Sequence, residues 1–179
     1  MLVSDLNIFL CFGGMIIKDM RSGVLFIIVL MTIFSFNCTT PKDMSTVKIH
    51  TIRMKPGEDV MLFLKDYIDR NKISAAFVMS AVGSLTRFHL RFANKESGTV
   101  SEGHFEVVSL TGLLSTAGMH LHMSVSESTG HTIGGHLLEG NFVYTTLEVV
   151  LGETNDMFYS RETDPTYGYK ELVVKPLKP

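Results

Sequence analysis

Four histidines lie in one stretch of the sequence, Gly118–Leu138, which reads GMHLHMSVSESTGHTIGGHLL. Imidazole nitrogens are common ligands of zinc and other borderline divalent metals, and three of them leave a fourth coordination position open. His120 and His122 alternate with Leu121 and Met123. Because successive side chains of a strand point to opposite faces, this alternation predicts a strand with a histidine-bearing face and a core face.

A short loop, Ser128-Thr129-Gly130, separates this strand from a returning one. Glycine at its end suits the left-handed residue of a three-residue hairpin loop. Such a loop pairs Glu127 with His131, and counting back along both strands sets His122 opposite His136 on one face. A two-residue turn would shift the register by one and send His136 to the other face. The loop length therefore decides whether a shared site exists.

The resulting hypothesis is a metal site formed by His120, His122 and His136. A single histidine on a strand is usually only a surface or core residue, and a pair two residues apart is weak evidence. Three that converge on one point would hold a divalent metal, with zinc the first choice, and could lower the pKa of a bound water toward neutrality. His131 is expected to be an exposed turn residue.

Carboxylates near such a metal could orient an imidazole or act as a base. Glu106 and Glu148 are the candidates for this catalytic role, and His104 is a weaker candidate. The alternative for each is an ion pair or a charge on an edge strand, and for His104 we favour that alternative.

The elements that would position these residues form a mostly antiparallel sheet with one long helix, which indicates an α+β fold. The helix is expected after Glu58 and Asp59, with an apolar stripe that ends near Ile68. Strands are expected at 47–54, 75–82, 85–92, 103–114, 118–126, 131–138, 141–151, 158–161 and 169–174, with a turn at Gly83-Ser84 and a bulge or bend at Gly112.

Basic residues alternate within the strand at 85–92, at Arg87, His89 and Arg91. They could contact an anion, but we favour a solvated polar face of the sheet. The whole chain has 179 residues, a net charge of -2 and a sequence pI near 6.4, so its overall charge does not favour nucleic acid. Both cysteines, Cys11 and Cys38, precede Pro41, so the later residues can form no cysteine metal site.

The first forty residues differ from the rest of the chain. Residues 1–40 contain two apolar runs, each shorter than the roughly 18 to 20 residues that span a bilayer. The second follows Met20, a possible true start, and Arg21, and it has the layout of a secretory signal peptide or an anchor. Its cleavage site is poor, and an uncleaved membrane-associating leader or a mispredicted start is the alternative. We expect a linker at 41–46, a domain at 47–175 and a tail at 176–179. A working leader would make the protein secreted or membrane-associated, and without one it would be cytoplasmic.

Several motifs, in order, resemble the PPC domain, also called the PCC domain or DUF296. They are FEVVSLTG at 105–112, MHLH at 119–122, Gly130, GGH at 134–136 and TTLEV at 145–149. The resemblance covers about residues 47–175 and implies a mostly antiparallel sheet flanked by helices, including short ones, assembled as a homotrimer. The histidine pattern is similar to the stand-alone prokaryotic type, and this implies metal binding by His120, His122 and His136.

Three function classes follow from the resemblance and the residues. The first is a trimeric metal-binding domain open to a small-molecule ligand, and, if it is an enzyme, one that performs metal-dependent hydrolysis or another Lewis-acid step. The second is a regulatory or DNA-associated binding module, and the third is a structural trimer. The plant type of the family that this sequence resembles gains its DNA binding from an AT-hook built around Arg-Gly-Arg-Pro. That core does not occur in this sequence. A membrane contact is expected only through the leader.

We predict that the protein does not bind duplex DNA tightly at physiological salt. Lysine and arginine contacts to phosphates dominate such affinity, and here the net charge is negative and no AT-hook is present. Fluorescence anisotropy with an AT-rich duplex would measure this, with an unrelated AT-hook protein as positive control. Sub-micromolar binding that persists at physiological salt would contradict the prediction.

Overall fold

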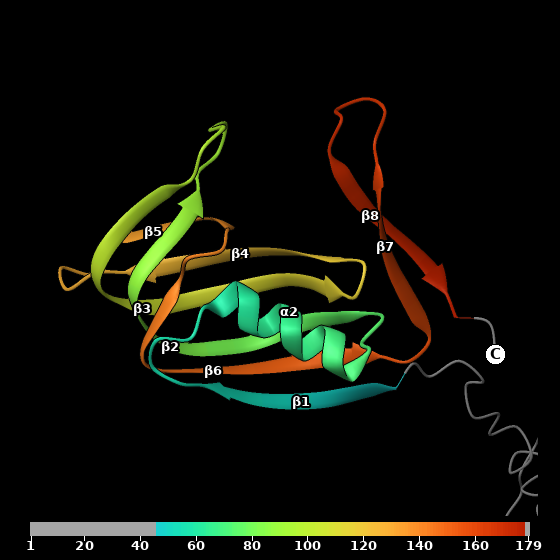
Figure 1. The fold of residues 1–179 in the computed structure, drawn as a ribbon, viewed down its shortest axis with the longest axis horizontal. Helices are drawn as coiled ribbons and strands as arrows, with labels where there is room; N and C mark the ends of the chain where they lie inside the picture. The colour runs from blue at the N-terminus through green and yellow to red at the C-terminus, as the bar shows by residue number, and fades with distance from the viewer. Residues whose placement is uncertain (1–45, 178–179) are drawn as a thin grey trace, which may run out of the picture. The chain divides into compact units, whose positions relative to one another are not determined.

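The computed structural model describes residues 46–177, so the expectations about the leader lie outside the described residues. Within these residues eight strands and one helix follow each other (Figure 1). Their bounds are β1 Val47–Met54, α2 Val60–Asn71, β2 Ala76–Arg91, β3 Thr99–Ser115, β4 Gly118–Ser126, β5 Thr132–Leu137, β6 Phe142–Thr154, β7 Met157–Thr163 and β8 Lys170–Pro176. The expected mostly antiparallel sheet is confirmed.

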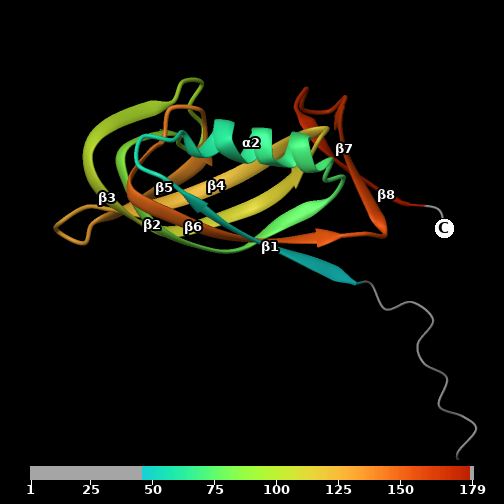
Figure 2. The same ribbon diagram turned by 60° about the horizontal axis from the view of Figure 1, so that its bottom comes forward.

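Six of the strands form one antiparallel sheet in the order β1-β6-β2-β3-β4-β5. Strand β5, at the end of this order, also pairs with β2, through Leu90 with Leu137 and Arg91 with His136. Strands β2, β3, β4 and β5 therefore close into a ring. Helix α2 lies across one face of this sheet, as both views show (Figures 1 and 2). Strands β7 and β8 form a separate two-stranded sheet that contacts β3.

Helix α2 is an amphipathic helix with defined ends. Asp59 caps its N-terminus by accepting hydrogen bonds from the backbone of Met61 and Leu62, and Lys72 ends it in the left-handed conformation. The buried stripe is Val60, Leu64 and Ile68. The helix has 12 residues, so the long helix that we expected is short, and residues 46–177 contain none of the expected short helices. No helix within this range is long and apolar enough to cross a membrane.

Two glycines permit close backbone approach rather than the turn and the bulge that we predicted for them. Strand β2 continues through Gly83, although its register against β6 shifts between Gly83 and Leu85, and a Cβ at Gly83 would collide with the carbonyl oxygen of Thr146 on β6. At Gly112 the pairing of β3 with β4 is regular, and a Cβ would collide with the carbonyl oxygen of His120. The register shift of this strand pair falls between Val107 and Ser109 instead.

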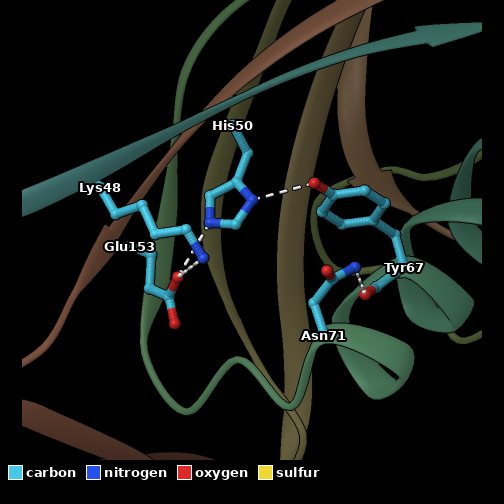
Figure 3. Close-up of polar contacts among 5 residues, drawn as sticks. All are labelled: Lys48, His50, Tyr67, Asn71 and Glu153. Carbon is cyan, nitrogen blue, oxygen red and sulfur yellow. Dashed lines mark hydrogen bonds and ion pairs between the residues drawn. The ribbon is translucent and has the colours of Figure 1, made fainter.

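A partly buried polar network, centred on His50, joins β1 to the helix and to β6 (Figure 3). His50 is 6% exposed, and its Nδ1 lies 2.9 Å from the Tyr67 hydroxyl while its Nε2 lies 2.8 Å from Glu153 Oε2. Lys48 Nζ lies 3.4 Å from the same carboxylate oxygen. Both nitrogens of this imidazole therefore have partners, as burial of a polar ring requires.

We predict that Gly112→Ala destabilises the domain by roughly 2 to 4 kcal/mol, because a methyl group would push the backbone of β4 away from β3. Gly57→Ala is the matched control. Gly57 also has a positive φ, of 81°, but nothing lies within 4 Å of the position of an added Cβ, so a loss of about 1 kcal/mol is expected. Urea unfolding would measure both, and equal losses would show that the close approach has no energetic consequence.

Candidate metal centre

The hairpin formed by β4 and β5 has the predicted three-residue loop. Glu127 donates its backbone N–H to the carbonyl oxygen of His131 at 3.1 Å, and Gly130 donates to the carbonyl oxygen of Glu127 at 2.9 Å. Along the two strands His122 pairs with His136. The predicted register is therefore confirmed, and His131 is exposed on the turn, as expected.

The alternation in β4 is also confirmed. Leu121, Met123 and Val125 are 0%, 1% and 0% exposed, and they belong to the core. His120 and His122 lie on the opposite face and are exposed. The buried face holds the strand in place, so the two histidines keep a defined orientation toward β5.

The two strands bring three imidazoles together at one point. The ring centroids of His120 and His122 are 5.1 Å apart, those of His120 and His136 are 5.1 Å apart, and those of His122 and His136 are 5.5 Å apart. One nitrogen from each ring lies within 4.8 Å of the other two. Nitrogens bound to a tetrahedral zinc are about 3.4 Å apart, so a modest rotation of the side chains would bring these into coordination distance.

Unlike His50, the three imidazole rings of the cluster have no hydrogen-bond partners among the described residues. Within residues 46–177 His136 Nδ1 is buried without a partner. An orphaned buried nitrogen is costly unless a ligand satisfies it. The donor set thus fits a metal such as zinc, and it is the one group of three or more metal-ligating side chains in the described part of the chain.

The environment favours neutral imidazoles, the form that binds metals. Burial, assisted by the nearby His120 and Arg91, lowers the pKa of His136 to about 4. Partial burial of the ring, together with the charge of Arg161, lowers the pKa of His120. Both rings are therefore uncharged at neutral pH, and their lone pairs are available to a cation.

Two adjoining cavities open onto the histidines. One has a volume of about 480 Å³ and the other about 280 Å³, and both are lined by Thr111, His120 and His122. The larger cavity also contains Arg91, whereas the smaller contains Arg161 with Glu171. The sequence does not indicate Arg161 and Glu171 as site residues, because nothing in the local pattern of β7 and β8 shows that this hairpin reaches the site.

The carboxylates that we expected near the metal lie elsewhere. Glu106 pairs with Ser126, four residues along β4 from His122, which is about 13 Å at the rise of a strand. Glu148 lies on β6 between Arg53 and Val82. Neither lines a cavity beside the histidines.

His104, the weaker candidate, is exposed and packs its ring against Tyr144, with centroids 4.3 Å apart. His104 lines neither cavity beside the three histidines, but its partner is an aromatic ring rather than the acidic side chain that the ion-pair alternative expects.

The basic residues of β2 do not form the solvated stripe that we favoured, because all three are half-buried. Arg87 lies over the ring of Phe142, 5.6 Å from its centroid, and His89 Nδ1 lies 2.7 Å from the carbonyl oxygen of Glu139. Arg91 alone reaches the histidines, because the closure of β5 onto β2 sets it opposite His136. Alternation within one strand could not show that three neighbouring polar residues have separate environments.

We predict that the metal-free protein loses stability as the pH falls from about 6.5 toward 4. In the unfolded chain His136 and His120 have the ordinary pKa near 6.5, whereas in the folded protein their pKa values are lower. Between about pH 6.5 and 4 the unfolded chain therefore binds more protons than the folded one, which lowers the stability of the fold. Above about pH 6.5 neither state binds these protons, and the stability is fully present. Solvent screening limits the effect to about 1 kcal/mol. Thermal melts across this range should show a shallower decline for His136→Gln than for the unchanged protein, with His131→Gln as control; identical slopes would contradict the assignment.

Solved structures with similar folds come from bacteria and archaea. A hypothetical protein from Salmonella cholerae-suis (Salmonella enterica) is 39% identical with a TM-score of 0.73, and the alignment covers 75% of this chain and 97% of that one. A PPC protein of Pyrococcus horikoshii is 24% identical with a TM-score of 0.61, covering 76% and 98%. A metal-containing protein of Archaeoglobus fulgidus is 22% identical with a TM-score of 0.60, covering 73% and 96%.

Among curated proteins, the chain is 37% identical over 137 residues to the bifunctional protein GlmU of Synechococcus sp. strain JA-2-3B'a(2-13). That match covers 76% of this chain but only 22% of the relative, so the similarity concerns one segment of a longer protein. Residues 42–155 match the family described as the Plants and Prokaryotes Conserved (PCC) domain. Together with the fold shared with the Pyrococcus protein, this match establishes that the chain belongs to the PCC, or PPC, domain family.

Proposed function

We propose that the domain binds one divalent metal ion through His120, His122 and His136 and presents it to a small polar ligand in the adjoining cavities. The observation that carries this proposal is the convergence of three imidazoles that have no other hydrogen-bond partners in the described chain. The fold relative from Archaeoglobus fulgidus, which is a metal-containing protein, supports it.

Zinc is the metal that we propose first. Among residues 46–177 the cluster consists of three neutral imidazoles with no thiolate or carboxylate, and this donor set suits a borderline divalent ion. Three protein ligands also leave a position open, which is the arrangement of catalytic rather than structural zinc sites. A metal held there would supply Lewis-acid activation of a bound water or of a ligand oxygen.

The chain's own residues would orient the ligand and accept a proton. Hydroxyl groups of Thr111 and Ser124 line the larger cavity beside the histidines and can donate or accept hydrogen bonds. Glu171 is the one carboxylate that lines either cavity within residues 46–177, so the proton-accepting role that we first gave to Glu106 or Glu148 passes to Glu171 in this proposal. Hydrolysis of a small polar substrate is the corresponding reaction class.

We also propose that the domain forms a homotrimer, as its family membership implies. Apolar side chains remain exposed on the neighbouring strands β2 and β3, where Met79 is 52%, Val82 59% and Val108 57% exposed. Burial of these side chains against other copies would stabilise an assembly by removing apolar surface from water.

We predict that His122→Ala or His136→Ala abolishes stoichiometric zinc binding while the protein stays folded and trimeric. Each change removes one of three ligands, and the remaining two nitrogens cannot hold the ion against competing water. Metal analysis after dialysis would give the zinc content per chain, and light scattering on a sizing column would give the oligomeric state. His131→Ala and His104→Ala are the matched controls, since both histidines lie outside the cluster.

Two results would count against the proposal. Zinc content that is equal in the cluster variants and in the controls would show that these histidines do not hold the metal. An unchanged protein that retains no divalent metal after exposure to zinc, cobalt or manganese would remove the proposed function itself.

A further inference from the structure

We infer that the ligand of this site carries an anionic group, a phosphate or a carboxylate, which Arg91 binds beside the metal with Arg161 as a second contact. The inference rests on the proposed function and deepens it by naming the chemical class of the ligand. Two half-buried arginines with unused hydrogen-bonding capacity carry it, one in each of the two cavities that meet at the histidines.

Arg91 is held at the site by the closure of the sheet. It is the last residue of β2, and it lies directly opposite His136 in the pairing of β2 with β5. Its charge is close enough to the cluster to lower the pKa of both His136 and His120. Within residues 46–177 its guanidinium has no ion-pair or hydrogen-bond partner, although the side chain is half-buried and lines the larger cavity.

Arg161 reaches the same histidines from the hairpin of β7 and β8. Its side chain lies against Gly118 at the start of β4, and it lines the smaller cavity with His120 and His122. It too has no ion-pair or hydrogen-bond partner among the described residues. The carboxylate of Glu171 shares this cavity, so the positive charge of Arg161 is partly compensated. Among residues 46–177, no acidic side chain lines the cavity of Arg91.

The positive charges of the metal and of the two arginines favour an anionic ligand. Neutral imidazoles leave a divalent metal with its full charge, and two guanidinium groups add to it within the same pair of cavities. Partly desolvated cations without counter-charges are unfavourable, and an oxyanion removes the penalty. Guanidinium binds phosphate and carboxylate through two parallel hydrogen bonds, which are about twice as strong as neutral ones.

The remaining lining of the larger cavity suits the same ligand. Ser109, Thr111 and Ser124 present hydroxyl groups, and Asn94 presents an amide from a left-handed backbone conformation with φ of 57°. Hydroxyl and amide groups can donate to the oxygens of an anion that an arginine has bound. A purely apolar ligand would leave these donors unsatisfied.

The test titrates inorganic phosphate, and separately acetate, into protein that carries one equivalent of zinc and no excess metal, at low ionic strength. We expect Arg91→Gln to weaken phosphate binding by about tenfold or more, through the loss of a charge-assisted pair, without changing the zinc content. Arg161→Gln should weaken it less, because Glu171 already compensates part of that charge. Arg70→Gln is the matched control, since Arg70 lies on α2 in an exposed pair with Asp66.

Arg91→Lys is the second variant in case Arg91→Gln fails to fold. Lysine keeps the charge but cannot form the bidentate hydrogen bonds of a guanidinium, so this variant should bind phosphate with intermediate affinity. The relative affinities of phosphate and acetate identify which anion the site prefers. A cobalt-loaded sample adds an independent readout, since an anion that enters beside the metal should change its visible absorption and the change should depend on Arg91.

The outcomes separate this inference from the proposed function. Suppose that zinc binds and that phosphate and acetate either do not bind at all or bind equally to the unchanged protein, Arg91→Gln and Arg70→Gln. The anion inference is then wrong, and the metal site stands. If zinc does not bind, the proposed function fails, and the titration of metal-free protein then decides the role of the arginines. Phosphate binding that depends on Arg91 would support that role, and its absence would overturn it.

Discussion

The register of the hairpin β4–β5 is the constraint on which the site depends. Because side chains alternate along a strand, a slip of one residue would turn His136 away from His122. Two glycines before His136 also let β5 fit between its neighbours, since a Cβ at Gly134 would lie 2.7 Å from Ser124 Oγ and one at Gly135 would lie 2.7 Å from the carbonyl oxygen of Arg91. The GGH motif therefore has a steric reason as well as a chemical one.

The closure of β5 onto β2 converts this hairpin into a charged cavity. It places the guanidinium of Arg91 beside the imidazole of His136. Because burial lowers the pKa of His136, this ring is neutral, and the positive charge of the site belongs to Arg91 and to any bound metal. His50 differs from the three site histidines, because both of its ring nitrogens form hydrogen bonds, one with Tyr67 and one with Glu153. A histidine committed to two protein partners stabilises a fold, whereas one without partners is available to a ligand.

Glycine was the residue that sequence reasoning interpreted least well. A glycine that ends a strand at a turn and one that admits a neighbouring backbone look the same in a sequence. Gly130 ends a turn, as the polar residues before it predict, whereas Gly83 and Gly112 lie within strands and face the backbones of β6 and β4. Only the positions of those partner strands distinguish the two uses.

The amino-acid sequence by itself determined the helix stripe, the alternation of β4 and the three-residue loop, and hence the set His120, His122 and His136. Each depends on residues a few positions apart, where periodicity and turn chemistry act directly. The tertiary structure alone decided that Arg91, Arg161 and Glu171 line the site and that Glu106 and Glu148 do not. Those placements follow from the closure of β5 onto β2 and from the packing of the β7–β8 hairpin, and contacts between residues about forty positions apart leave no local pattern in the chain.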